Sequence, residues 1–417
     1  MTAGEPIQRL RIYLSERDMA EGQPLYLVAL ERLRREGASG ATALRGVAGF
    51  GAGHRLRTAG MADLNQTAPI IIEWLDRADR IARVLPTLDT LLGDALITIE
   101  EIRAYRATLR SSGPFGGRAV ADVARGEVLT IAPGELLADA FERLARSHQP
   151  LLAIVDGDRL VGVVTPDDAA RFGAPPLDVL AELDGEECAA ALARVPAHPL
   201  VNVFGEPRTI YIESSVAHTV NMMVEWGLDA LPVIDRHGKA AGIFGIEQAL
   251  QAALTADRSS ERVRQAEPPP PVSLIMQMLV PTVASRTDAA TALAQLLRTP
   301  SRLLVLVDGL RPAGMLSPAG VTRQLRAPLR TAWLAALAGD GAPLATLAEA
   351  ATTGLSAMEL ATPDIPLIEA RASEYDAIRT LLEGSHQYLV VVDDEGRLAG
   401  LVTRRGLLRA LAQESSG

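Results

Sequence analysis

A threonine and an aspartate three residues apart, Thr165 and Asp168, follow an apolar segment and open a polar one. A hydroxyl at the N-cap of a helix lies beside free backbone N–H groups, where an anion is favoured. A carboxylate three residues later can accept hydrogen bonds from two hydroxyl groups at once. These two side chains are therefore the first candidates for ligand binding.

The same place recurs three more times along the chain, with other residues in it: Gly245 and Gln248, Ser317 and Gly320, Thr403 and Gly406. The acidic residue is lost in all three of these copies, so we expect one or two ligand sites rather than four. The last copy adds Arg404 and Arg405, whose guanidinium groups are suited to facing phosphates.

Two histidines stand just before apolar segments, in Ser147-His148-Gln149 and in Ser385-His386-Gln387. Both triplets stand where a predicted helix ends and a predicted strand begins, and one interpretation is that both histidines are partly exposed loop residues. The six histidines of the chain are dispersed without the spacing of metal ligands, so no metal site is predicted.

A repeated unit must position these residues. Each copy reads as an amphipathic helix, an apolar strand that ends at an aspartate, a second strand that opens at a glycine, and a polar helix start. The aspartates and glycines of the four copies are Asp156, Asp235, Asp308 and Asp393, with Gly162, Gly242, Gly314 and Gly400. Such repeats stack to bury a continuous core, and we expect the four copies to pack on each other within one chain.

The first hundred residues have another pattern. Strands are predicted at 10–14, 40–47, 69–74 and 95–99, and helices at 24–35 and 77–91. The order β-α-β-β-α-β is the split, ferredoxin-like arrangement. A connection at 48–67 is rich in glycine and arginine, and it serves either as a ligand loop or as a flexible link with solvated arginines; its candidate residues are Gly49, Phe50, Gly51 and Arg55.

Composition limits the class of protein. The chain is 48% hydrophobic and 22% charged, which is typical of a folded globular protein. Its net charge of −10 argues against a nucleic-acid partner, and its single cysteine, Cys188, excludes a disulfide within one chain. No apolar run predicts a signal peptide or membrane span, so we expect a cytoplasmic protein. Glycine-rich and proline-rich breaks divide the chain into domains at 1–112, 118–264 and 272–417.

The four units resemble CBS domains, whose tandem pairs form Bateman modules, over nearly all of residues 120–413. The resemblance implies an adenine nucleotide as ligand, whether AMP, ADP, ATP or a cyclic nucleotide. It implies that the hydroxyl residue contacts phosphate and the acid holds the ribose. Only the first unit matches fully, from Gly162 to Asp168. The candidate nucleotide-binding set is Thr165, Asp168, His148, Gln149, Ser317, Thr403, Arg404, Arg405 and His386.

The N-terminal part resembles the PII-like proteins, and within them the family called domain of unknown function 190. Stretches that carry the resemblance are 40–51 (GATALRGVAGFG) and 93–101 (GDALITIEE). It implies a homotrimer with ligand clefts between subunits, and a membrane transporter as a possible partner. PII proteins proper have a lysine before the last strand that Gly93-Asp94-Ala95 lacks, which leaves Arg103 as a candidate phosphate ligand.

The chain contains no phosphate-binding P-loop, no His-Glu-x-x-His and no Gly-x-Ser-x-Gly. We therefore predict an α+β protein, with a ferredoxin-like domain followed by four α/β CBS domains. Its predicted role is that of a non-catalytic regulator which senses a small-molecule nucleotide and needs no metal. The alternative is a nucleotide-regulated enzyme with a hydrolytic site in the clefts of the trimer.

Overall fold

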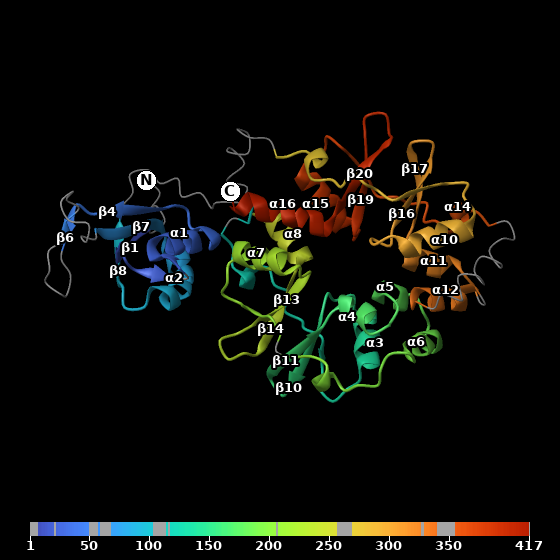
Figure 1. The fold of residues 1–417 in the computed structure, drawn as a ribbon, viewed down its shortest axis with the longest axis horizontal. Coiled ribbons are helices and arrows are strands. Elements are labelled where there is room, and N and C mark those ends of the chain that lie inside the picture. Colours follow the sequence, from blue (N-terminus) through green and yellow to red (C-terminus); the bar gives the residue numbers. More distant parts are fainter. Residues whose placement is uncertain are drawn as a thin grey trace, which may run out of the picture.

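The computed structural model describes residues 7–20, 22–49, 57–58, 68–102, 114–115, 117–205, 207–256, 269–326, 329–339 and 355–416. An N-terminal domain lies to one side of a larger body built from four repeats, and it approaches that body beside helices α7 and α16 (Figure 1).

The N-terminal domain is an antiparallel sheet of order β4-β7-β1-β8 with two helices on one face. Its main elements are β1 (Ile7–Ser15), α1 (Leu25–Arg35), β4 (Ala41–Arg45), β7 (Pro69–Arg77), α2 (Ala78–Leu92) and β8 (Leu96–Ile102). Short ribbons pair β2 (Met19–Ala20) with β3 (Gln23–Pro24), and β5 (Ala48–Gly49) with β6 (Arg57–Thr58). The order of the main elements confirms the ferredoxin-like prediction.

Alternation of apolar and polar residues decides which face of this sheet is covered. Fully buried strand residues beneath α1 and α2 include Leu10, Ile12, Ile72 and Trp74. Successive side chains of a strand point to opposite faces. Arg11 and Glu73 therefore lie on the uncovered face, where Arg11 Nε donates to a Glu73 carboxylate oxygen at 2.8 Å.

Each of the four repeats has a short parallel strand, a helix, a β-hairpin and a closing helix. The first consists of β9 (Thr130–Ile131), α3 (Leu137–Ser147), β10 (Leu152–Asp156), β11 (Arg159–Val164) and α4 (Pro166–Arg171). The second consists of β12 (Ile210–Tyr211), α7 (Val216–Trp226), β13 (Ala230–Ile234), β14 (Ala240–Gly245) and α8 (Ile246–Thr255).

The third repeat consists of β15 (Thr282–Ala284), α10 (Ala289–Arg298), β16 (Leu304–Asp308), β17 (Arg311–Leu316) and α11 (Pro318–Gln324). The fourth consists of β18 (Leu367–Glu369), α15 (Glu374–Glu383), β19 (Tyr388–Val392), β20 (Leu398–Thr403) and α16 (Arg404–Ser416). Connecting helices are α5 (Leu177–Leu180), α6 (Gly185–Leu192), α12 (Leu329–Leu337) and α14 (Ala357–Leu360), with 3-10 turns at η1 (Val120–Asp122), η2 (Leu200–Asn202) and η4 (Val272–Leu274).

The hairpin glycines do not open the second strand, as the sequence had suggested, but are its third or fourth residue. At two hairpins the glycine has a packing reason. The segment before the first repeat crosses β14, where Arg125 and Ile243 exchange backbone hydrogen bonds. A Cβ atom on Gly242 would lie 2.8 Å from the Arg125 carbonyl oxygen. In the second pair a Cβ on Gly400 would lie 2.9 Å from the carbonyl oxygen of Gln277. The two glycines let the chain cross the hairpins of the second and fourth repeats.

The four repeats pack into one body within the chain, which confirms that expectation. Sheets of the third and fourth repeats share a core that includes Val305 and Val390, and those of the first and second share one that includes Leu151 and Ile243. Helices of the second and fourth repeats form a further common core. The first and third repeats meet where Glu187 on α6 accepts hydrogen bonds from Arg330 on α12, at 3.0 and 3.2 Å.

Candidate functional site

A pocket of about 690 Å³ lies where all four repeats meet. We call it the central pocket. Each repeat contributes the residue that stands six places before its hairpin aspartate, and the strand registers confirm that the four residues are equivalent. These equivalent residues are Pro150, Asp229, Arg302 and Gln387. The chain therefore builds one site from four copies of the same corner between helix and strand.

A left-handed residue lies at each of these corners; in the third repeat it is Arg302 itself, with φ 46°, and in the other three it lies two places earlier. His148 has φ 54°, Gly227 has φ 68° and Ser385 has φ 51°. His148 of the first triplet thus has the structural place of Ser385 in the second, so the two Ser-His-Gln triplets are offset by one residue. His148 and Gln149 line the central pocket, with His148 exposed, whereas the fourth repeat contributes Gln387 and not His386.

Gln149 also has a structural role at its corner. Its side-chain oxygen accepts from the Leu129 amide at 3.0 Å, and its side-chain nitrogen donates to the Glu127 carbonyl at 3.4 Å. These bonds fix the segment that enters β9 against the corner.

Thr165 and Asp168 contact each other at the start of α4. The amide and the hydroxyl of Thr165 both donate to the same Asp168 oxygen, each at 2.8 Å. This is the carboxylate half of a capping box, which stabilises the first turn of a helix. Neither side chain lines the central pocket, whereas the adjacent Pro166 and Asp167 do. Their predicted roles at ribose and phosphate remain predictions.

The equivalent residues of the other repeats cap their helices in two ways. Gln248 accepts from the Gly245 amide at 3.0 Å, as Asp168 does from Thr165. In the other two repeats the hydroxyl is the acceptor. The Gly320 amide donates to the Ser317 hydroxyl at 3.2 Å, and the Gly406 amide donates to the Thr403 hydroxyl at 3.0 Å. Ser317 and Thr403 thus cap their helices and do not line the pocket.

Arg404 makes its hydrogen bonds within the fourth repeat, whereas Arg405 joins that repeat to the second. Arg404 lines the central pocket, and its guanidinium donates to the carbonyls of His386 at 2.7 Å and Leu381 at 3.3 Å. Burial lowers the pKa of Arg404 from its ordinary value. Arg405 binds both carboxylate oxygens of Asp229, at 2.8 and 2.6 Å, and this hydrogen bonding raises its pKa.

Charged residues that the sequence did not single out also line the pocket: Arg125, Asp167, Asp178, Asp229, Glu247 and Arg302. Asp178 is open to the pocket, but surrounding protein desolvates its carboxyl and raises its pKa, and Arg302 partly opposes that shift. Within the described residues, the side chains of Arg125 and Arg302 make no hydrogen bond or ion pair. Aligning the repeats on their aspartates would have found Arg302, which stands six residues before Asp308 as Asp229 does before Asp235. Asp178, on a connecting helix, had no such signal.

The glycine-rich connection of the N-terminal domain is described only at its ends. Gly49 lies in β5 and pairs with Arg57. Phe50, Gly51, Arg55 and Arg103 lie outside the described residues. Cys188 is buried, and desolvation raises the pKa of its thiol. The described part of the chain has no group of three His, Cys, Asp or Glu side chains placed to hold a metal ion. Within that same part, no helix is long and apolar enough to cross a membrane.

Known relatives match the N-terminal domain. The DUF190 family model, described as an uncharacterized ACR, matches residues 7–104. A UPF0166 protein of Aquifex aeolicus is 34% identical over 93 residues, which cover 22% of this chain and 88% of the relative. A UPF0166 protein of Methanocaldococcus jannaschii is 37% identical over 103 residues, which cover 23% of this chain and 90% of the relative. The chain belongs to the DUF190 (UPF0166) family.

This DUF190 member also carries CBS domains, whose family model matches residues 120–174, 196–254 and 357–413. The third repeat lies outside these ranges but has the same strand and helix order. Similar solved structures include protein MJ1225 of M. jannaschii, 15% identical with a TM-score of 0.48 over 70% of this chain and 99% of that one. Another is CBSX2 of Arabidopsis thaliana in complex with AMP, 23% identical with a TM-score of 0.26 over 33% and 96%.

Proposed function

We propose that this DUF190-family protein is a non-catalytic regulator that senses an adenine nucleotide through its CBS repeats. The observation that carries the proposal is the central pocket, to which every repeat contributes a corner residue. Its volume of about 690 Å³ falls among those of small-molecule sites, which span about 300–1,000 Å³. Binding there brings the four repeats under the influence of one ligand.

The candidate residues fall into two groups in this proposal. His148, Gln149 and Arg404 line the pocket directly, while Thr165, Asp168, Ser317, Thr403, Arg405 and His386 do not line it. When the nucleotide enters, the hydrogen bonds between Thr165 and Asp168 break. Thr165 then contacts the phosphate, and Asp168 contacts the ribose. Capping groups can exchange partners in this way because a bound anion at a helix start satisfies the same amides.

A thermal-shift and calorimetry screen of the purified chain with AMP, ADP, ATP and cyclic AMP tests the proposal. A ligand present at 100 times its Kd adds about 2.7 kcal/mol of stability. We expect at least one of the four to do so, with no turnover when the products are analysed. If none binds, the nucleotide sensor is wrong, and if one is hydrolysed, the protein is an enzyme.

We propose further that the N-terminal domains assemble as a homotrimer through the uncovered face of the sheet. One row across the four strands is apolar, because Leu44 pairs with Ile71, Ile71 with Tyr13, and Tyr13 with Leu96. Leu96 is 62% exposed and Leu44 47% exposed, so the row is open in the single chain. Light scattering should give three times the 44.2 kDa chain mass, and a monomer would contradict the trimer.

The regulated partner in this proposal is a membrane transporter in contact with a cytoplasmic sensor. Co-purification from detergent-solubilised membranes, with and without the nucleotide found in the screen, tests the partner. Recovery of the sensor in the soluble fraction under both conditions would contradict a transporter partner.

A further inference from the structure

The N-terminal domain touches the second repeat through a buried carboxylate. Glu36 follows the last turn of α1 and is only 3% exposed. One of its oxygens accepts a hydrogen bond from the hydroxyl of Ser215, the N-cap of α7, at 3.1 Å. The other lies 3.6 Å from His218 Nδ1 and has no hydrogen bond. The side chain of Glu36 is thus removed from water, and the hydrogen bond from Ser215 is what it gains in return.

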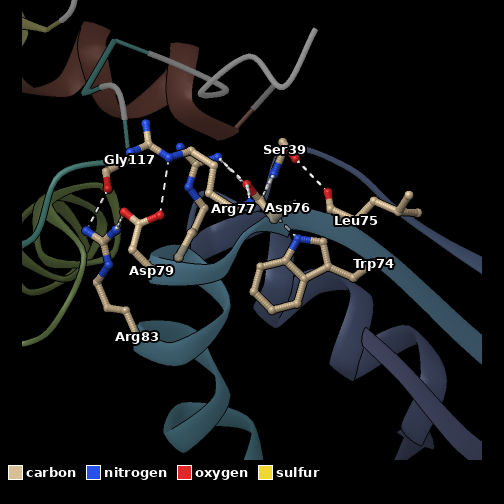
Figure 2. Close-up of polar contacts among 9 residues, drawn as sticks. Ser39, Trp74, Leu75, Asp76, Arg77, Asp79, Arg83 and Gly117 are labelled. Atoms are coloured by element: carbon tan, nitrogen blue, oxygen red, sulfur yellow. Dashed lines mark hydrogen bonds and ion pairs between the residues drawn. The ribbon is translucent and has the colours of Figure 1, made fainter. Parts of the chain in front are cut away.

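A second contact holds the chain that joins the two parts. The carbonyl oxygen of Gly117 accepts from Arg83 on α2 at 2.8 Å (Figure 2). Gly117 has φ +69°, and a Cβ there would lie 2.7 Å from a guanidinium nitrogen of Arg80. Two residues earlier, Phe115 is buried in the core shared by the second and fourth repeats.

Arg80 is held in place by a network inside the N-terminal domain. Its guanidinium pairs with Asp76, whose carboxylate is fully buried, at 3.1 Å. The same carboxylate accepts from the Trp74 indole at 3.0 Å and from the Ser39 amide at 2.8 Å (Figure 2). These interactions hold in place the part of the N-terminal domain that contacts Gly117.

Two segments of the chain lead from these contacts to the central pocket. Helix α7 begins beside Glu36 and ends at Gly227, two residues before Asp229, which lines the pocket and is held by Arg405. Its 11 residues span about 16 Å. The segment from Gly117 runs through η1 to Arg125, which also lines the pocket.

The buried contact at Glu36 is only partly satisfied by hydrogen bonds within the described residues. A buried carboxyl oxygen without a hydrogen-bond partner costs free energy. Burial lowers the pKa of His218, which disfavours the charged form of the ring beside Glu36. Because Ser215 is the N-cap of α7, a movement of α7 changes this contact directly.

We propose that the junction of Glu36 with Ser215 and His218 couples the central pocket to the N-terminal domain, with α7 and residues 117–125 as the connection. Ligand binding at the pocket and docking of the N-terminal domain then change each other's equilibrium by the same factor. The identity of the ligand rests on the proposed function, but the mechanical coupling does not.

A ligand-free experiment tests the coupling by itself. Asp229→Asn in the full chain weakens the Arg405 pair at the pocket end of α7, and hydrogen exchange is read at the amides of Gly37 and Ala38 beside Glu36. We expect exchange there to be at least threefold faster than in the wild type. The control is Asp156→Asn, an exposed carboxylate on the first hairpin, which should leave these amides unchanged. Equal exchange in the Asp229→Asn and wild-type proteins would overturn the proposal.

A second experiment changes the junction and reads the pocket, with AMP as the probe. Glu36→Gln and His218→Gln should each change the AMP affinity of the full chain at least fivefold in calorimetry. Glu31→Gln is the control, because Glu31 lies on the same helix but pairs only with Arg34 and Arg35. Affinities within twofold of the wild type would overturn the coupling and leave the sensor intact. If the wild type does not bind AMP, exchange at Gly37 and Ala38 alone decides the coupling.

Discussion

At the scale of single residues, the carboxylate of Asp168 does two jobs in our account. In the ligand-free chain it caps α4 through the amide and hydroxyl of Thr165. In the proposed complex it holds the ribose. The two roles differ in what they change, since a cap affects stability and a ligand contact affects affinity.

Asp168→Ala should therefore lower both quantities. Loss of a cap costs about 0.5–2 kcal/mol of stability, and loss of a charged hydrogen-bond partner costs about 1.5–3 kcal/mol of binding, or at least tenfold in affinity. Thermal unfolding and calorimetry measure the two effects. Asp288→Ala is a matched control, because Asp288 accepts an amide hydrogen bond from Thr291 at 2.9 Å at the start of α10 and does not line the pocket. It should lose stability alone; if Asp168→Ala behaves identically, Asp168 is only a cap.

A second buried carboxyl makes the stability of the fold depend on pH. Glu374 follows the N-cap Ser373 of α15 and is fully buried, in the place that Val216 has in the second repeat. Burial and the adjacent Glu414 raise the pKa of Glu374 to about 8. The folded state thus binds a proton that the unfolded chain, with an ordinary pKa of 4.5, releases earlier.

The stability from Glu374 should be present below about pH 4.5 and fall as the pH rises to about 8, by at most about 1.4 kcal/mol per pH unit. Glu374→Gln removes this dependence, so the variant should be more stable than the wild type at pH 8. Urea unfolding across this pH range measures the effect. Glu383→Gln, an exposed change on the same helix, should retain the wild-type slope; a wild-type slope in Glu374→Gln would contradict the buried charge.

At the scale of elements, the hairpin glycines decide how closely the chain can cross a sheet. Arg125 and Ile243 both line the central pocket and are joined by backbone bonds beside Gly242. A methyl group on Gly242 would push the two segments apart. Gly242 thus allows the backbone hydrogen bonds that hold two pocket residues, Arg125 and Ile243, together.

Gly242→Ala should destabilise the protein by about 1–3 kcal/mol, the usual cost of overpacking, because its Cβ would lie 2.8 Å from the Arg125 carbonyl. Thermal unfolding measures the loss. Gly185→Ala is the control, since its Cβ would meet open space at the start of α6. A Gly242→Ala protein as stable as this control would show that the crossing segment relaxes freely.

At the scale of the whole molecule, the central pocket joins two CBS pairs that are far apart in sequence. Arg302 comes from the third repeat, whereas Thr165 and Asp168 come from the first. One nucleotide that spans the pocket would contact both pairs. We therefore predict one bound nucleotide per chain, which calorimetry will report as a stoichiometry of one.

Arg302→Ala should weaken that binding at least tenfold, because a charge-assisted bond to a phosphate contributes about 1.5–3 kcal/mol. The control is Arg298→Ala, an exposed arginine at the end of α10 in the same repeat. Unchanged affinity in the Arg302→Ala protein would show that the ligand contacts only the first pair.

The sequence by itself determined the local structure. Apolar alternation predicted β1 and β7, the order of elements predicted the ferredoxin-like domain, and the spacing of aspartates and glycines predicted four repeats. These features depend on neighbouring residues, whose periodicity sets the buried face of each element. Capping residues were also visible, because a cap bonds only three residues along the chain.

Only the tertiary structure decided which residues meet. Asp229 pairs with Arg405 across 176 residues, and Glu36 with Ser215 across 179. Packing between helices of different repeats sets such contacts, and local periodicity does not encode it. The two Ser-His-Gln triplets look equivalent in sequence, but the strand register pairs His148 with Ser385, as does the spacing of eight residues before Asp156 and Asp393. The domain boundaries and the ligand roles of the candidate residues stay predictions, since they depend on binding and assembly beyond one chain.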